Sequence, residues 1–236
     1  MAYGINLKGS DGSHIISSEW HMLKFVGKGS NISKICSVNR LGKLCYYGVI
    51  SSPALSLTSA PTLFYNIASG KNLSLSRLYS YDATHWRIDF NSYYDVYPDT
   101  YWFEEIDKDA SDDTHGMRLY DADSNLIFDS GWLTNDILRI KAIYNLTATN
   151  GQSITVASAI TKPALIFYSK YCRLEEYEGG YDNNVYDHAL KNVSNVFTVE
   201  EQCVQSTRYP YGAYDPQTIY DGSTYIVPVI NGADYD

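Results

Sequence analysis

Short runs of alternating apolar and polar residues recur along this chain, which is the pattern of half-buried β-strands. In residues 3–20, Ile5 and Leu7 share one face, an Asp/Gly turn follows, and a second apolar run comes after it. Strand, turn and strand in this order predict a β-hairpin. Residues 115–132 repeat the same pattern, so we expect a second hairpin there.

The two hairpin segments align without gaps at a constant offset of 112 residues. Six aligned pairs are identical: Gly4/Gly116, Leu7/Leu119, Asp11/Asp123, Ile15/Ile127, Ser18/Ser130 and Trp20/Trp132. A second pair of similar segments follows in the same order, PTLFY at 61–65 and PALIFY at 163–168. The interval before it is longer in the first half, and we assign the excess to an extra hairpin at 36–45. These matches predict an internal duplication.

The predicted fold is therefore all-β, with two related small β-sandwich-like domains arising from an internal duplication. The first domain is expected at 1–106 and the second at 114–236, where it ends in a Tyr-rich C-terminal arm. Residues 107–113 are polar and acidic, as in a linker. The alternative is that both landmarks are generic patterns of one all-β chain.

Most other segments are also predicted to be strands, and one segment is ambiguous. Residues 186–206 carry apolar positions that suit either a helix or loop and strand. After Thr207 the chain is rich in Tyr, Pro, Gly and Asp, which predicts a long irregular segment. The clearest strand patterns are 46–50, 86–90, 153–157 and 225–230.

Composition supports a loop-rich β protein and narrows its partners. The 236 residues include 23 Tyr, and 18 Lys+Arg against 27 Asp+Glu give a net charge of −9. The net charge is +1 for 1–106, −3 for 107–113 and −7 for 114–236. A non-specific nucleic-acid binder needs a basic surface, so this class is excluded. No run of apolar residues is long enough for a membrane-spanning helix, and the N-terminus has no secretory signal pattern.

The sequence offers little catalytic chemistry. The five histidines have no metal-binding spacing, and nucleophile or phosphate-loop motifs are missing. The run starting at Asp107 lacks the Gly and the closing Glu of a calcium loop. Carboxylate pairs for glycoside hydrolysis stay open at Glu104–Glu105 and Glu175–Glu176. We expect a protein that is not an enzyme and that has no cofactor and no metal.

Cysteines and sequons give weaker signals. Cys36 and Cys45 lie in the expected extra hairpin, where either a disulfide or two thiols would fit, and we favour thiols. Four Asn-x-Ser/Thr sequons, which begin at Asn31, Asn72, Asn145 and Asn192, are interpreted as chance products of composition.

Aromatic residues gather in two places. Tyr and Trp are enriched at protein interfaces, but β-sandwiches also use them in their cores. We assign the first group to core packing and the second to a partner interface. The first group is Tyr93, Tyr94, Tyr97, Tyr101 and Trp102, and the second is Tyr209, Tyr211, Tyr214 and Tyr220.

The hairpin motif resembles the start of many bacteriophage tail proteins, with Tyr-Gly, an alternating strand, an Asp/Gly turn and an ending of the Phe-Asp-Ser type. The second copy matches this ending through Phe128-Asp129-Ser130, whereas the first copy keeps Tyr3-Gly4 but ends in Ile16-Ser17-Ser18. The resemblance covers the two hairpin segments and carries no catalytic residues.

The resemblance implies a structural virion protein of the tail, at its tip, as an adaptor or at a fibre attachment. Such a protein is made in the host bacterial cytoplasm and binds other tail proteins, as a homo-oligomer in a symmetric assembly. Neither nucleic acid nor membrane insertion is implied. The alternative is a receptor-binding protein that recognises a host-surface glycan or protein.

Overall fold

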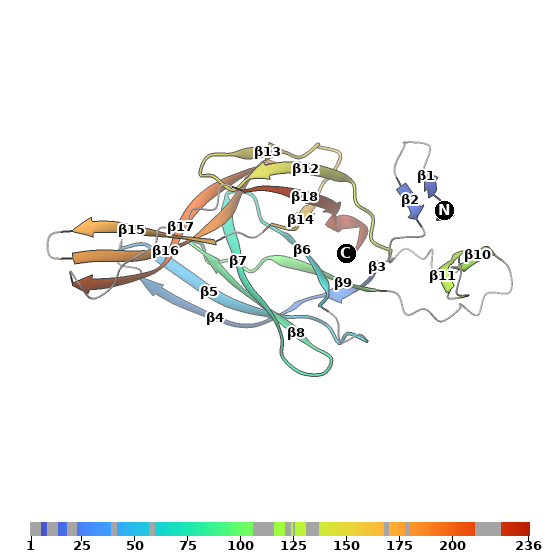
Figure 1. The fold of residues 1–236 in the computed structure, drawn as a ribbon, viewed down its shortest axis with the longest axis horizontal. Helices are drawn as coiled ribbons and strands as arrows, with labels where there is room; N and C mark the ends of the chain where they lie inside the picture. Colours follow the sequence, from blue (N-terminus) through green and yellow to red (C-terminus); the bar gives the residue numbers. More distant parts are fainter. Residues whose placement is uncertain are drawn as a thin grey trace.

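The structure is a computed structural model, and it confirms the all-β fold. It describes residues 6–8, 14–17, 23–38, 42–56, 60–105, 116–120, 124, 126–130, 137–167, 170–177, 180–210 and 223–236. Two antiparallel sheets form a β-sandwich-like body with projections at both ends (Figure 1). A short 3-10 helix, Gly232–Asp234, lies near the C-terminus. No helix in the described part of the chain is long and apolar enough to cross a membrane.

The first sheet has six strands, and its two middle strands are the similar segments found in the sequence. Its order is β12 (Ala142–Thr147), β18 (Thr224–Asn231), β14 (Pro163–Leu165), β6 (Thr62–Asn66), β9 (Asp99–Glu105) and β3 (Leu23–Lys28). β6 and β14 pair with each other, with Leu165 opposite Tyr65. The two landmarks therefore meet at the centre of one sheet.

The second sheet has eight strands and forks at β16. Its order is β13 (Ser153–Thr155), β17 (Val196–Pro210), β16 (Gly180–Val193), β7 (Lys71–Ser80), β8 (Trp86–Ser92), β5 (Leu44–Ser51) and β4 (Ser30–Val38), and β15 (Lys170–Tyr177) also pairs with β16. One end of each sheet comes from the second half of the chain and the other end from the first half.

The segments predicted as two domains, 1–106 and 114–236, share both sheets rather than each closing a sandwich of its own. β6 pairs with β9 on one edge and with β14 on the other, and the second edge of β14 pairs with β18. One main core lies between the sheets and combines Leu63 with Leu146, and Phe90 with Phe197. The linker 107–113 lies outside the described residues, and the origin by duplication stays a prediction.

Strand β9 shows how the six-stranded sheet is buried on both faces. Trp102 lies in the main core, whereas its neighbours Tyr101 and Phe103 belong to a second cluster. Successive side chains of a strand point to opposite faces, so an unbroken aromatic run serves two cores. Tyr235 packs against Phe103 in the second cluster, with ring centroids 5.2 Å apart. The assignment to core packing is confirmed for Tyr101 and Trp102, because both are buried. It is wrong for Tyr97, which is 38% exposed, and Tyr93 and Tyr94 are only partly buried.

The ambiguous segment 186–206 is a β-hairpin. β16 and β17 pair from Val193 and Val196 outward, and the two residues between them, Ser194 and Asn195, have positive φ angles of 52° and 66°. Two positive φ angles in a two-residue loop are the geometry of a type I′ turn, which matches the twist of paired strands. β17 continues to Pro210, so the stretch after Thr207 begins as strand and not as an irregular segment.

The predicted extra hairpin at 36–45 is present as β4 and β5. Cys36 lies opposite Tyr46 and Cys45 opposite Ser37, so the two cysteines are offset by one position and are not joined by a disulfide. Cys45 is buried and Cys36 is exposed.

Two of the four sequons are buried structural amides. The Asn192 side chain donates to the Ile67 carbonyl at 2.7 Å, and the Asn72 side chain accepts from the Tyr93 N–H at 3.1 Å. Both asparagines are at most 5% exposed, which leaves no room for a glycan and agrees with the interpretation of these sequons as chance.

Candidate assembly surfaces

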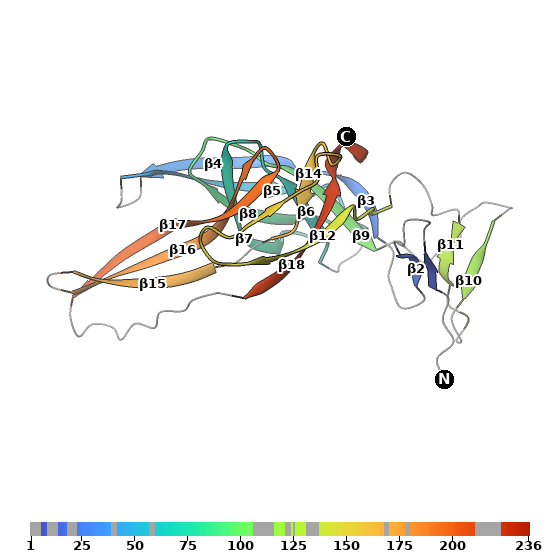
Figure 2. The same cartoon turned by 90° about the horizontal axis from the view of Figure 1, so that it is seen from above.

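The two predicted hairpins are present and have the same register. β1 (Asn6–Lys8) pairs with β2 (His14–Ser17), and β10 (Arg118–Tyr120) pairs with β11 (Leu126–Asp129). All three residue pairs of the first hairpin coincide with those of the second at the offset of 112, and both ladders shift register at the same step. Each hairpin is a separate two-stranded sheet, and both lie at the end of the molecule that carries the N-terminus (Figures 1 and 2).

The second hairpin shows why the motif has a Gly at position 116 and a Ser at position 130. The Ser130 side chain accepts a hydrogen bond from the Met117 N–H at 2.9 Å, and the Ser130 N–H donates to the Met117 carbonyl at 2.9 Å. A Cβ on Gly116 would lie 2.1 Å from the Ser130 hydroxyl, and Gly116 has a φ of 150°, which L side chains rarely adopt. Ser130 thus closes the hairpin through Met117, and its hydroxyl leaves space only for a glycine at position 116.

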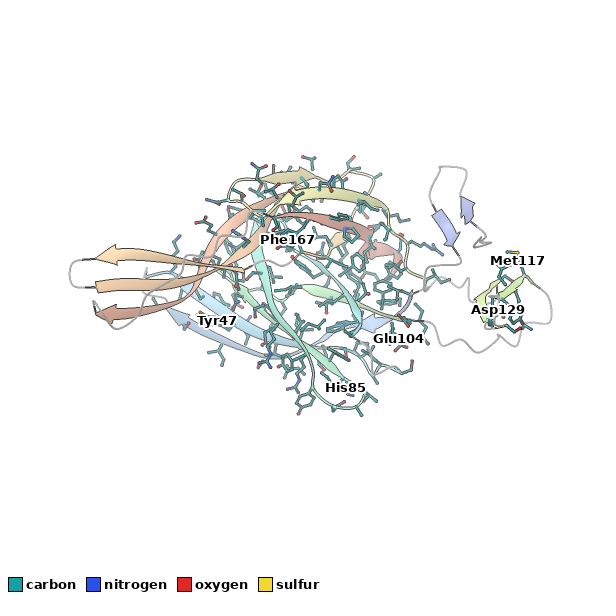
Figure 3. The ribbon with its side chains drawn as sticks, in the orientation of Figure 1. Tyr47, His85, Glu104, Met117, Asp129 and Phe167 are labelled. Carbon is teal, nitrogen blue, oxygen red and sulfur yellow. The ribbon has the colours of Figure 1, made fainter. Side chains whose placement is uncertain are left out.

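The hairpins differ at one cross-strand pair. In the second hairpin Arg118 lies opposite Asp129, and the Arg118 Nε donates to the Asp129 carboxylate at 2.8 Å. Asp129 is buried, and Figure 3 labels it across the hairpin from Met117. In the first hairpin the equivalent pair is Asn6 and Ser17, which has no charge. The Asp of the Phe-Asp-Ser ending and its Arg partner thus occur together in the second hairpin, and both are replaced by uncharged residues in the first.

Two arms project from the opposite end of the sandwich. One consists of β4 and β5, and the other of β15, β16 and β17 (Figures 1 and 2). β4 is nine residues long and almost wholly exposed. Large apolar side chains stand in solvent on this first arm: Ile32, Ile35, Val38 and Leu44. An exposed apolar edge strand is a template for pairing with another chain.

A buried polar cluster lies at the fork of the eight-stranded sheet, where the two arms diverge. β16 pairs with β15 up to Asp187 and with β7 from Leu190 onward. The Asp187 carboxylate accepts hydrogen bonds from the Ser74 hydroxyl at 2.9 Å and the Asn91 amide at 2.6 Å. These bonds tie β16 to β7 and β8 where the strands diverge. Sequence reasoning missed this cluster, because its members are distant in sequence and each is a common polar residue.

Lys34 on β4 joins the first arm to a cluster of aromatic residues. Lys34 forms an ion pair with Asp95, and its Nζ lies 4.3 Å from the centre of the Tyr97 ring and 5.9 Å from that of Tyr46. The hydrogen bond to Asp95 raises the pKa of Lys34. Tyr97 in turn packs against Phe90 in the core. Lysine side chains thus lie over two tyrosine rings of the segment between β8 and β9: Lys34 over Tyr97, and Lys71 over Tyr94.

The C-terminus is fixed to the six-stranded sheet. Lys162 contacts Asp99 at 2.7 Å and Asp236 at 2.9 Å, and Tyr101 donates to Asp236 at 3.2 Å. Burial raises the pKa of Tyr101 to about 12. Although its own burial opposes ionisation, hydrogen bonds from Lys162 and Lys28 hold the pKa of Asp236 below its usual value.

The remaining predicted residues fall into two groups. Tyr209 lies on β17 opposite Tyr181, at the second arm, whereas Tyr211, Tyr214 and Tyr220 lie outside the described residues. Their role as a partner interface stays a prediction.

The carboxylate candidates gain no catalytic geometry from the described residues. Glu104 is buried, accepts hydrogen bonds from the Ser56 N–H and hydroxyl at 2.7 and 2.8 Å, and lies 3.4 Å from Lys24, so it fixes a loop (Figure 3). Glu175 and Glu176 lie on β15. Within the described ranges, no three His, Cys, Asp or Glu side chains are placed to hold a metal ion. The calcium-loop candidate at Asp107 lies outside these ranges.

The stability of the loop between β7 and β8 is expected to depend on pH through Asp82. The Asp82 carboxylate accepts hydrogen bonds from the N–H groups of Thr84 and His85, both at 2.8 Å, and lies 3.0 Å from the His85 ring. These contacts, the Thr84 N–H first, lower the pKa of Asp82 from 3.8 to about 2. Ionised Asp82 therefore stabilises this loop above pH 3.8, and its contribution disappears as the pH falls through about 2.

Carboxyl NMR titration is expected to give a midpoint near 2 for Asp82. Asp82→Asn should remove this titration, and it should loosen the loop above pH 3.8 but make no difference below about pH 2, where the wild-type loop has already lost the contribution of ionised Asp82. A midpoint near 3.8 would contradict the hydrogen-bonded loop.

The chain was compared with protein-family models, with curated proteins and with solved structures. No protein-family model, no curated protein and no solved structure matches it.

Proposed function

We propose that this chain is a structural protein of a bacteriophage tail, at the tail tip, as an adaptor or at a fibre attachment, and that it acts by assembly with other tail proteins. The observation that carries the proposal is the pair of register-matched hairpins, because they bear the motif that resembles tail proteins. Each hairpin pairs with no other strand in the described part of the chain, so it is available to a neighbouring subunit.

The arms add a second kind of support. An assembly protein needs surfaces that associate without being part of its own core, and β4 presents apolar side chains of this kind. Three buried carboxylates of the described residues have structural partners: Glu104 binds a loop, Asp129 pairs with an arginine, and Asp187 lies at the fork of the sheet.

The proposal is tested in a phage that encodes this chain. We expect mass spectrometry of purified particles to detect the chain in a fixed ratio to other tail proteins, and labelled antibody to mark the tail in electron micrographs. Absence of the chain from intact particles would contradict the proposal. Binding of the pure chain to host cells, with labelling only at the outermost tip, would instead favour the receptor-binding alternative.

A matched pair of variants tests the role of the hairpins. Gly116→Val should prevent closure of the second hairpin, because its side chain collides with Ser130. Gly151→Val introduces comparable backbone strain, with a φ of 87°, in a turn with open space around it. In phage lacking the gene and complemented in trans, only Gly116→Val should fail to enter particles. Equal incorporation of both variants, with both folded, would show that the second hairpin is dispensable.

A further inference from the structure

The edge strands of the two sheets are protected to very different degrees. On β3, the outer edge is covered by the chain that follows the second hairpin, where the Leu138 N–H donates to the Leu23 carbonyl at 2.8 Å. β13 has three residues and β12 has six, whereas β4 has nine. Natural edges are usually guarded by shortness, by proline or by charged side chains.

β4 lacks these protections. It contains no proline, and its single charged residue, Lys34, forms an ion pair with Asp95. β4 pairs with β5 along one edge, and no other strand of the described residues pairs with its second edge. In both views β4 lies on the side of the molecule away from β15, so the strands of the second arm do not cover it (Figures 1 and 2). A backbone edge in this state is suited to receiving another strand.

The residue pattern of β4 reads nearly the same in both directions from Ile35. Ser33 and Ser37 lie two positions to either side of it, and Ile32 and Val38 lie three positions to either side. The three apolar side chains are exposed, by 68% at Ile35, 64% at Val38 and 49% at Ile32. Two copies of one strand that pair about a twofold axis run antiparallel, and positions equally far from the axis face each other. An axis at Ile35 therefore sets isoleucine against isoleucine and serine against serine, and brings Ile32 of one copy close to Val38 of the other.

The charge of β4 is also compatible with a second copy of itself. With an axis at Ile35, Lys34 of one copy faces Cys36 of the other, and the two lysines stand diagonally across the axis, about 7–8 Å apart. Each lysine is already neutralised by its own Asp95. Two neutral ion pairs do not repel each other as two bare lysines would, so neither strand presents an uncompensated charge to its partner.

We propose that β4 of one copy pairs with β4 of a second copy about a twofold axis at Ile35, so that two eight-stranded sheets join into one antiparallel sheet. The ladder between β4 and β5 is antiparallel and regular from Ser33 to Val38, so the new ladder continues the same pattern on the other edge. A nine-residue strand is only about 30 Å long, and its edge buries less than the roughly 800 Å² per partner of a standard interface. The dimer of the isolated chain is therefore expected to be weak and to form at high protein concentration.

A charge swap at Ile35 tests both the partner and the register. Ile35→Lys and Ile35→Glu each place two like charges directly across the axis. In sedimentation velocity of the purified full chain, each variant alone should associate more weakly than the wild type by roughly tenfold or more. An equimolar mixture of the two variants should associate again, because lysine then faces glutamate. Only a position that faces itself in the second copy gives this result.

The same two substitutions at Ile226 are the matched control. Ile226 is also an isoleucine on a strand and is 72% exposed, but it lies on β18 of the other sheet. Ile226→Lys and Ile226→Glu should leave association unchanged, alone or mixed, and circular dichroism should show that all four variants are folded. A wild type that is monomeric at every concentration would overturn the proposal, and so would charge-swapped Ile35 variants that fail to associate when mixed.

Disulfide trapping checks the register independently. Directly opposite residues of paired antiparallel strands have Cα atoms about 4.5–5.5 Å apart, which is within the range that a disulfide spans. In a chain whose exposed Cys36 is changed by Cys36→Ser, Ile35→Cys is expected to yield a linked dimer on mild oxidation, whereas Ile226→Cys is not. Equal linking by both variants, or none by Ile35→Cys, would refute an axis at Ile35.

This inference deepens the proposed assembly function and rests on it for its biological setting. The two can fail separately. A chain that is found in particles but does not associate with itself would retain the tail function and lose the pairing of β4, whereas a chain that dimerises through β4 but is absent from particles would do the reverse.

Discussion

Replacing Trp102 by alanine is expected to lower the free energy of unfolding by about 3–5 kcal/mol, the range for large aromatic side chains in a core. Trp102 is fully buried, and its indole N–H donates to the Thr100 hydroxyl at 3.1 Å. The side chain also fills the space left by Gly29, where a Cβ would lie 2.6 Å from the indole nitrogen. Alanine would leave a cavity between the sheets that neighbouring strands cannot close.

Denaturant unfolding followed by circular dichroism measures this loss, and the melting temperature should fall by roughly 10 °C or more. Tyr81→Ala is the control, since Tyr81 is 55% exposed on a loop and loses a cation–π contact with Arg87 that is worth about 0.5–1 kcal/mol at an exposed site. A cost for Trp102→Ala below about 1 kcal/mol would mean that the sheets do not pack around this residue.

The second large effect is expected at the fork of the eight-stranded sheet. Asp187→Ala removes the acceptor of the Ser74 hydroxyl and the Asn91 amide, which are both buried. A buried donor left without its acceptor costs about 1–3 kcal/mol, so the two together predict a loss of about 3 kcal/mol. Hydrogen exchange should also rise in β7, β8 and β16, because these strands lose their common tie.

Gln202 supplies the matched control for Asp187. It lies directly opposite Asp187 on β17 and is fully buried, but its amide atoms have no hydrogen-bond partner within the described residues. Gln202→Met keeps the volume and removes an unsatisfied polar group, so it should be neutral or stabilising. A similar loss for both variants would show that the fork depends on packing and not on the carboxylate.

Local patterns in the sequence predicted the hairpins well. The segments 3–20 and 115–132 carry their own turn residues, and the positions paired in the two copies coincide. The turn at Ser194–Asn195 was not recognised, because neither residue is the glycine that usually marks a type I′ turn. Periodicity alone therefore left 186–206 undecided.

Sheet partners were harder to predict, because strand pairing depends on contacts between distant segments. The likeness of 61–65 and 163–168 suggested two separate domains, yet these strands pair with each other. The candidate surfaces could not be predicted in full for the same reason, because they too depend on distant segments. The first arm was expected as a hairpin, but its exposed apolar edge and the Asp187 cluster became visible only when the neighbours were known.

The shared sheets also set the order in which this protein can fold during synthesis. The Asn66 amide of β6 donates to the carbonyl of Pro163, 97 positions later in the chain, so β6 has no partner on that side until β14 has left the ribosome. Until then, this strand edge from the first half of the chain is unpaired. A fragment that ends near residue 106 is expected to aggregate rather than fold.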